Sequence, residues 1–243
     1  MDSLTDIISG LAELRPTLAE FYQDLHRHPE LSMEETRTAA KAAERLRADG
    51  YQVTAGVGKT GVVGILEHGS GPTVMLRADM DALPVREQTG LAYASNVTAI
   101  DSEGQTVPVM HACGHDFHVT CLSGAASLLS SKRKRWSGRL MVVFQPAEET
   151  ASGARAMLDD GLFDRFGNPD IILGQHVAPT PAGMLVWRAG VSMAAADSLE
   201  IVLFGRGGHS SRPQTCVDPV VMAAAVVMRL QGIVSREVAP DEQ

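Results

Sequence analysis

The spacing of hydrophobic residues at the start of the chain indicates helices. Apolar side chains recur every three or four residues between positions 4 and 18, as they do on one face of an amphipathic helix. The segment "HRHPE" interrupts this pattern at Pro29, and Ser32 with Glu35 matches a capping box. We therefore expect one helix before Pro29 and a second that starts at the capping box and ends at Gly50.

After Gly50 the hydrophobic residues form the short runs that are typical of strands. Three runs follow one another closely: "YQVTAG", "GVVGILE" and "TVMLRAD". A helical pattern over residues 116–131 is followed by the apolar run "RLMVVFQP", and another over residues 152–160 is followed by "DIILGQHV". We expect both runs to be buried strands. Continuous apolar strands that alternate with helices predict an α/β fold whose sheet is mostly parallel and covered on both faces.

The pattern changes again near residue 193. The segment "DSLEIVLFGRGGHSSRP" alternates like a strand and runs into a glycine-rich turn, and "VDPVVMAAAVVMRLQGIV" predicts an apolar helix with Pro219 in its first turn. We expect residues 1–193 to form the α/β domain and 194–243 to begin a separate α+β unit. The sequence ends before the strands that would cover this helix, so we expect an incomplete unit with an exposed apolar face.

Composition and charge restrict the classes of partner. The net charge of −8 over 243 residues argues against a nucleic-acid partner, and we interpret the one basic run, Lys132–Arg135, as a solvated helix end. The three cysteines are an odd number and are widely spaced, which argues against a disulfide framework. The first residues do not resemble a signal peptide, and no apolar run is long enough for a membrane span. We expect a cytoplasmic protein with no membrane partner.

The segment "HACGHDFH", residues 111–118, concentrates one cysteine and three histidines in eight positions. Cys113 and His115 are two residues apart, which in extended backbone places both side chains on the same side. Thiolate and imidazole are good zinc ligands and acceptable ligands for manganese or cobalt. A single cysteine here would be read as a small buried hydrophobe, but that reading does not account for the Cys-x-His spacing. The cluster predicts a metal site.

Polar side chains also follow three of the predicted strands. Glu148 and Glu149 follow "FQPA", His176 follows "IILGQ", and Asp79 and Asp81 lie in "LRADMDALP". A Glu-Glu pair alone is usually solvated, but in open α/β sheets ligands bind at the carboxyl edge of the strands. The two aspartates suit either metal ligands or partners that orient them. We expect all of these side chains to meet the cysteine–histidine pair at one edge of the sheet.

Six motifs in this order and spacing resemble one family. They are "LHRHPELSMEE", "LRADMDALPV", "HACGHDFH", "FQPAEE", "GQHV" and "GRGGHSSRP". The chain resembles the N-acyl-amino-acid amidohydrolases, the hippurate hydrolase-like group of co-catalytic metallopeptidases that includes the auxin-conjugate hydrolases. The resemblance implies a zinc-peptidase-like α/β/α catalytic domain followed by the start of a lid domain. Through that lid relatives often form dimers, which implies a homodimer for a full-length parent.

The resemblance also implies a role for each matched residue. The implied metal ligands are Cys113, His115, Glu149 and His176. Glu148 matches the general base, and Asp81 matches an aspartate that orients an active-site group. His209 matches a lid histidine that stabilises the tetrahedral intermediate, and the alternative is a surface turn residue beside Gly207 and Gly208. We interpret His26 and His28 as structural residues, since nothing in the sequence pairs them with the cluster.

The implied reaction is hydrolysis of the amide bond of a small N-acyl amino acid, assisted by two divalent ions that are manganese, zinc, cobalt or nickel. The part of the family that carries the last metal-ligand histidine is absent from this sequence, so a catalytically impaired metal-binding fragment is the alternative. A further alternative makes Cys113 a nucleophile with His115 or His118 as its base. That reading leaves Glu148, Glu149 and His176 without roles.

Overall fold

The computed structural model describes residues 3–191 and 199–238. The chain divides between Pro179 and Thr180 into two compact units, and each is described by itself. The boundary expected near residue 193 lies outside the described residues. Among the described helices, none is both long enough and apolar enough to cross a membrane.

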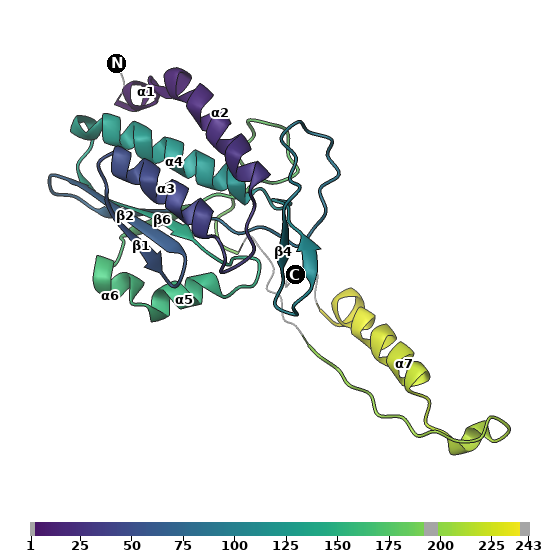
Figure 1. Cartoon of the computed structure of the whole chain (residues 1–243). Coiled ribbons are helices and arrows are strands. Elements are labelled where there is room, and N and C mark those ends of the chain that lie inside the picture. The colour runs from purple at the N-terminus through teal and green to yellow at the C-terminus, as the bar shows by residue number, and fades with distance from the viewer. Residues whose placement is uncertain (1–2, 192–198, 239–243) are drawn as a thin grey trace. The chain divides into compact units, whose positions relative to one another are not determined.

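A five-stranded sheet forms the centre of the first unit (Figure 1). Its strands are β1 (Gln52–Val57), β2 (Gly61–His68), β3 (Thr73–Asp79), β6 (Gly138–Gln145) and β7 (Ile171–Gly174), in the spatial order β1-β2-β6-β3-β7. The pairs β6–β3 and β3–β7 are parallel, while β2 is antiparallel to both of its neighbours. Four of the five strands therefore point the same way, and the predicted α/β fold is confirmed. A separate antiparallel hairpin joins β4 (Thr98–Ile100) to β5 (Thr106–Pro108).

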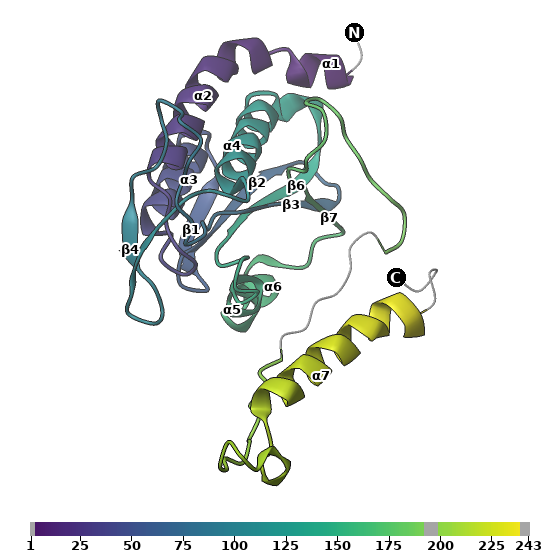
Figure 2. The same cartoon turned by 90° about the vertical axis from the view of Figure 1, so that its right-hand side faces the viewer.

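Helices cover both faces of this sheet (Figure 2). One layer contains α1 (Ser3–Ile8), α2 (Leu11–Arg27), α3 (Thr36–Ala48) and α4 (His115–Ser131), and the opposite layer contains α5 (Gly153–Asp159) and α6 (Leu162–Phe166). Strand β6 shows why two layers are needed, because successive side chains point to opposite faces. Leu140, Val142 and Phe144 pack into the core beneath the first layer. Met141 and Val143 pack against the second layer.

The N-terminal helices differ from the expectation in two ways. The single helix expected over residues 4–18 is broken after Ile8, and α2 begins only at Leu11, beyond Gly10, a residue with low helix propensity. The expected capping box is wrong, because α3 begins at Thr36 with Glu35 at its N-cap position, and no side chain at that position caps the helix with a hydrogen bond. Ser32 instead donates to a distant aspartate, and the side chain of Glu35 is fully buried.

The apolar run around β7 was expected to be buried, and this is wrong in the described structure. Ile171, Ile172 and Leu173 are each about half exposed. The reason is topological: β7 pairs with β3 on one side and forms the edge of the sheet. An edge strand keeps one side free of backbone partners.

The second unit contains the helix α7 (Pro219–Gly232), which starts where the sequence predicts. Asp218 accepts a hydrogen bond from the backbone N–H of Val220, and Pro219 occupies the first turn. Short helical turns at Arg133–Arg135 (first unit), Pro213–Thr215 and Ile233–Glu237 complete the described helices. The side chains of α7 are exposed or half-buried, including exposed Val220, Val221 and Met228.

The strand expected before the glycine-rich turn is not formed. Residues 197–198 lie outside the described part of the chain, and 199–205 have no strand assignment. In the described part of the second unit, the backbone pairing closest to a strand is a single isolated antiparallel bridge between Arg206 and Val217. A run of alternating apolar residues becomes a strand only when a neighbouring strand accepts its backbone hydrogen bonds.

Candidate metal centre

The carboxyl ends of β3 and β6 and the start of α4 meet at one edge of the first unit. Asp79, the last residue of β3, lies in register with Gln145, the last residue of β6. The chain leaves these strands toward Asp81 and toward the Glu148–Glu149 pair, and α4 begins at His115. The structure therefore brings together side chains that the sequence placed in separate motifs.

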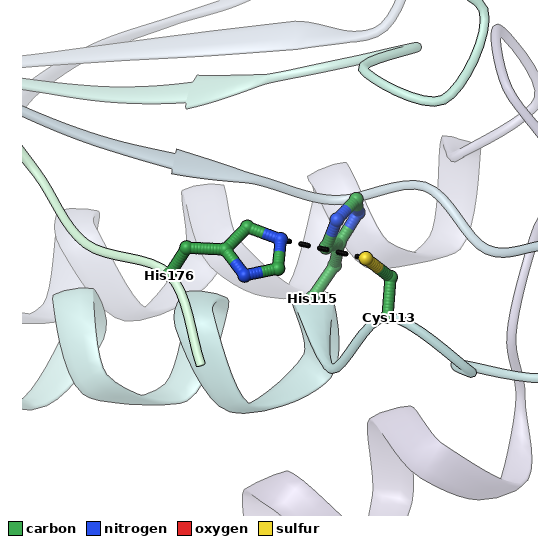
Figure 3. A group of neighbouring side chains, drawn as sticks. All are labelled: Cys113, His115 and His176. Carbon is green, nitrogen blue, oxygen red and sulfur yellow. Dashed lines mark hydrogen bonds between the residues drawn. The ribbon is translucent and has the colours of Figure 1, made fainter. Parts of the chain in front are cut away.

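Cys113, His115 and His176 form a compact group at this edge (Figure 3). One ligand atom from each lies within 4.8 Å of the others. The Cys113 Sγ atom is 3.4 Å from His176 Nε2, and the His115 ring lies beside both. Cys113 comes from the loop before α4, whereas His176 comes from the segment that follows β7.

The two glutamates contact the same histidine. Glu148 Oε2 and Glu149 Oε1 each lie 3.8 Å from His115 Nε2, and these three residues form a second group of close ligand atoms. His115 is thus shared by the two groups. The other three predicted metal ligands and the predicted base therefore lie around this one histidine.

Gly114 explains the spacing of the cysteine–histidine pair. It precedes α4 with a φ of 82°, in the left-handed region that favours glycine. A Cβ atom at this position would lie 2.6 Å from a methyl carbon of Val177. The motif therefore needs a glycine between its two candidate ligands, because the segment that carries His176 packs directly against it.

The Asp81 carboxylate accepts four hydrogen bonds at the centre. Its Oδ1 accepts from the backbone N–H of Glu148 at 3.0 Å and from His115 Nδ1 at 3.2 Å. Its Oδ2 accepts from the backbone N–H of Glu149 at 3.0 Å and from Ser32 Oγ at 2.6 Å. By holding the proton of His115 on Nδ1, Asp81 leaves Nε2 free to face the glutamates, which is the usual task of a carboxylate behind a metal-ligating histidine.

His118, to which the sequence gave a role only in the cysteine-nucleophile alternative, orients the segment that carries His176. The backbone N–H of Val177 donates to His118 Nε2 at 2.9 Å, so the proton of this ring is on Nδ1 and is donated to Asp79 Oδ1 at 2.5 Å. Arg77 in turn donates to Asp79 Oδ2 at 2.9 Å. The three-residue step from His115 to His118 places both on one helix face, and this spacing could have revealed the pair.

Burial and charge around Asp79 act in opposite directions. Burial raises the pKa of the Asp79 carboxyl, but the hydrogen bond from His118 and the charges of His115 and Arg77 outweigh it, and the pKa falls to about 2. Asp79 is therefore ionised at neutral pH. Its carboxylate accepts the hydrogen bond that orients His118.

The donor set fits a divalent cation. His115 Nε2 and Glu149 Oε1 are buried atoms that have no hydrogen-bond partner among the described residues, and buried polar atoms of this kind call for an explanation. Burial and the charges of Glu149, Glu148 and Asp79 raise the pKa of the Cys113 thiol to about 11. A positive ion would satisfy the two free atoms and favour the thiolate. One sulfur, imidazole nitrogens and carboxylate oxygens suit a borderline metal such as zinc.

The remaining predicted residues lie elsewhere. His209 is in the second unit, exposed, where its Nδ1 contacts Ser211 Oγ at 2.8 Å and accepts from the Ser211 N–H at 3.2 Å. Its implied role in stabilising an intermediate stays a prediction. His26 bridges Asp116 Oδ2 at 2.6 Å and Glu87 Oε1 at 3.1 Å, which ties the end of α2 to the start of α4.

Comparison with known proteins identifies relatives of the whole chain. Hippurate hydrolase of Campylobacter jejuni is 41% identical over 237 residues, which cover 97% of this chain and 59% of the relative. The structure of Bacillus subtilis YxeP, described as a dinuclear metal binding peptidase from the M20 family, matches with 38% identity and a TM-score of 0.61 over 69% of this chain and 44% of its own.

A protein of methicillin-resistant Staphylococcus aureus, provisionally termed an aminohydrolase, matches with 32% identity and a TM-score of 0.78 over 97% of this chain and 60% of its own. The chain thus spans less than two thirds of the length of these relatives. Residues 75–238 match the model of peptidase family M20/M25/M40. The chain belongs to this family.

Proposed function

We propose that the protein to which this chain belongs hydrolyses the amide bond of N-acyl amino acids in a metal-dependent reaction. The observation that carries the proposal is that two groups of candidate ligand atoms share His115: Cys113 and His176 lie in one, and Glu148 and Glu149 in the other. Support for the substrate class comes from the 41% identity to a hippurate hydrolase, because hippurate is an N-acyl amino acid.

We assign the metal ligands to this cluster. Cys113, His115, Glu149 and His176 would hold the metal, and the description of YxeP as a dinuclear protein supports two ions rather than one. Manganese, zinc, cobalt and nickel all remain candidates, and the cysteine favours a softer ion. A divalent ion bound here supplies Lewis-acid chemistry, in which it polarises a carbonyl and lowers the pKa of water.

Glu148 is the proposed general base. Its side chain is 39% exposed, whereas that of Glu149 is 18% exposed, so Glu148 is the more accessible of the two to substrate and water. In the proposed reaction its carboxylate takes a proton from water and then gives it to the nitrogen of the departing amino acid. Asp81 holds the backbone of both glutamates and so keeps their side chains directed at His115.

His209 is the proposed donor to the negative charge that develops on the carbonyl oxygen. A preorganised donor of this type contributes about 3–4 kcal/mol in other enzymes. The support for this role is its match to the lid histidine of the family. The same family pattern supports a homodimer of the full-length protein.

A cysteine nucleophile is the competing mechanism. It is disfavoured because burial and the surrounding carboxylates raise the pKa of the Cys113 thiol to about 11, whereas activated cysteines have a lowered pKa. It also leaves Glu148 and Glu149 with no part in the reaction.

Removal of the metal separates these mechanisms. We expect release of glycine from N-benzoylglycine by the metal-loaded protein, complete loss of this activity on treatment with a chelator, and recovery when zinc or manganese is added back. The measurement is glycine release followed by amine detection. Activity that survives chelation but is lost on alkylation of thiols would contradict the proposal. Bound metal without hydrolysis of N-benzoyl or N-acetyl amino acids would favour a metal-binding fragment instead.

A further inference from the structure

Glu35 lies at an unusual position for a glutamate. It belongs to the motif "LSMEE", and its side chain is fully buried in the first unit. Its neighbour Glu34 shows the ordinary behaviour, because the Glu34 side chain is 66% exposed and pairs with Lys59. Carboxylates are rarely buried completely unless their oxygens are satisfied. The partners of Glu35 therefore indicate what this side chain does.

All of these partners are hydrogen-bond donors. Glu35 Oε1 accepts from the backbone N–H of Ala147 at 2.8 Å and from the backbone N–H of Met33 at 3.0 Å. Glu35 Oε2 accepts from Thr60 Oγ1 at 2.5 Å. The contact to Ala147 spans 112 residues of sequence and ends at the residue immediately before Glu148. Glu35 thus connects the start of α3 to the loop that carries the proposed base.

The two backbone groups held by Oε1 belong to residues in an uncommon conformation. Ala147 has a φ of 46° and Met33 a φ of 65°, both in the left-handed region, and neither is a glycine. Such residues persist only where the surrounding structure holds them. Ala147 is completely buried, and among the described residues its backbone N–H donates to Glu35.

Together with Asp81, Glu35 fixes three consecutive amides. The N–H groups of Ala147, Glu148 and Glu149 all donate to these two buried carboxylates, which come from other parts of the sequence. The turn that follows β6 is therefore held by two side chains outside it, in addition to the hydrogen bonds from its own Ser152 and Gly153 amides to the Ala147 carbonyl. A small rotation of Ala147 would redirect both glutamates, because they are the next residues along the chain.

We propose that Glu35 is a positioning residue of the metal centre, which holds Ala147 in its left-handed conformation and so directs Glu148 and Glu149 toward His115. This inference rests on the proposed function for the roles of the two glutamates. It assigns no contact between Glu35 and substrate or metal. Glutamine should replace Glu35 nearly as well, because its carbonyl oxygen can accept from both N–H groups while its amide donates to the Thr60 hydroxyl.

The test compares three variants of this chain: Glu35→Gln, Glu35→Ala and the exposed matched control Glu34→Ala. The first readout is amide hydrogen exchange of the metal-free protein, on the peptide that spans residues 146–151. The second is the affinity for zinc, measured by calorimetry. We expect Glu35→Ala to lose exchange protection in this peptide and to bind zinc about 10–100-fold more weakly, as is typical when a residue that orients metal ligands is removed. Glu35→Gln and Glu34→Ala should stay close to the parent protein in both readouts.

Protection of strand β6, residues 138–145, shows whether a variant is folded. A folded Glu35→Ala protein with unchanged protection at 146–151 and unchanged zinc affinity would overturn the proposal, and so would an equal loss in Glu35→Gln. If Glu35→Ala does not fold, Thr60→Val takes its place, since it removes only the donor to Glu35 Oε2. This variant should raise the hydrogen exchange of residues 146–151 and leave that of β6 unchanged. The absence of that rise would overturn the proposal. Neither readout depends on hydrolysis, so a failure of the proposed function would instead show as a parent protein that binds zinc without releasing glycine from N-benzoylglycine.

Discussion

Replacement of Glu148 by glutamine is expected to lower kcat for N-benzoylglycine by about 10²–10⁴-fold, the usual contribution of a general acid–base group. The expected reason is the loss of a carboxylate that can take and return a proton, with little change in shape. Because Glu149 rather than Glu148 has the buried oxygen without a partner, the metal affinity of Glu148→Gln should stay within a few-fold of the parent value. Steady-state kinetics and zinc calorimetry on the same preparation measure both quantities.

The matched variant is Glu149→Gln, one residue further along the same loop. It should reverse the pattern, with weaker zinc binding as the primary effect, because Glu149 Oε1 is the oxygen that remains free in the buried centre. If the two variants gave the same result, or if Glu148→Gln kept the parent kcat with metal bound, the assignment of base and ligand would be wrong.

Replacement of Asp81 by alanine is expected to damage both stability and metal binding. The change leaves four donors in or near the buried centre without their acceptor: two backbone N–H groups, an imidazole N–H and the Ser32 hydroxyl. Each buried donor left unpaired costs about 1–3 kcal/mol in the free energy of unfolding. Zinc affinity should fall about 10–100-fold, because His115 and both glutamates lose the group that orients them.

Urea unfolding of the metal-free protein and zinc calorimetry check the two parts of this prediction. Ser32→Ala is the matched control, because it removes one of the four donors and leaves the carboxylate in place. Its unfolding free energy should fall by about 0.5–1.5 kcal/mol, with zinc affinity close to that of the parent protein. An Asp81→Ala protein that is as stable as the Ser32→Ala protein would show that Asp81 does not hold the centre together.

The sequence predicts the position of this centre because its parts are local. Cys113 and His115 share one short motif, and Glu148, Glu149 and His176 each follow an apolar strand, so the rule that ligands bind at the carboxyl edge places them together. The convergence seen in the structure agrees with that expectation. The residues that orient these side chains are harder to predict from the sequence, because their contacts join distant segments. His118 and Val177 are 59 residues apart in the sequence, and Glu35 and Ala147 are 112 residues apart.

The errors in the predicted fold have a related cause. The residues of β7 are as apolar as a buried strand requires, yet their burial depends on whether another segment lies beside them, and in the described structure β7 is the edge. Ser32 and Glu35 have the spacing of a capping box, yet a distant aspartate and a distant backbone amide are their partners. A local sequence pattern is compatible with several structures, and the tertiary contacts of the segment determine which one forms.

Titration with cobalt(II) near neutral pH tests the central claim most directly. Without a cation the Cys113 thiol stays protonated, with its pKa raised to about 11 by burial and the neighbouring carboxylates, so a thiolate should form only when metal binds and displaces the proton. We predict a sulfur-to-cobalt charge-transfer absorption that saturates with bound metal and is absent in Cys113→Ser. Cobalt binding with no such absorption in the parent protein, or no binding at all, would contradict a metal centre built on Cys113, His115 and His176.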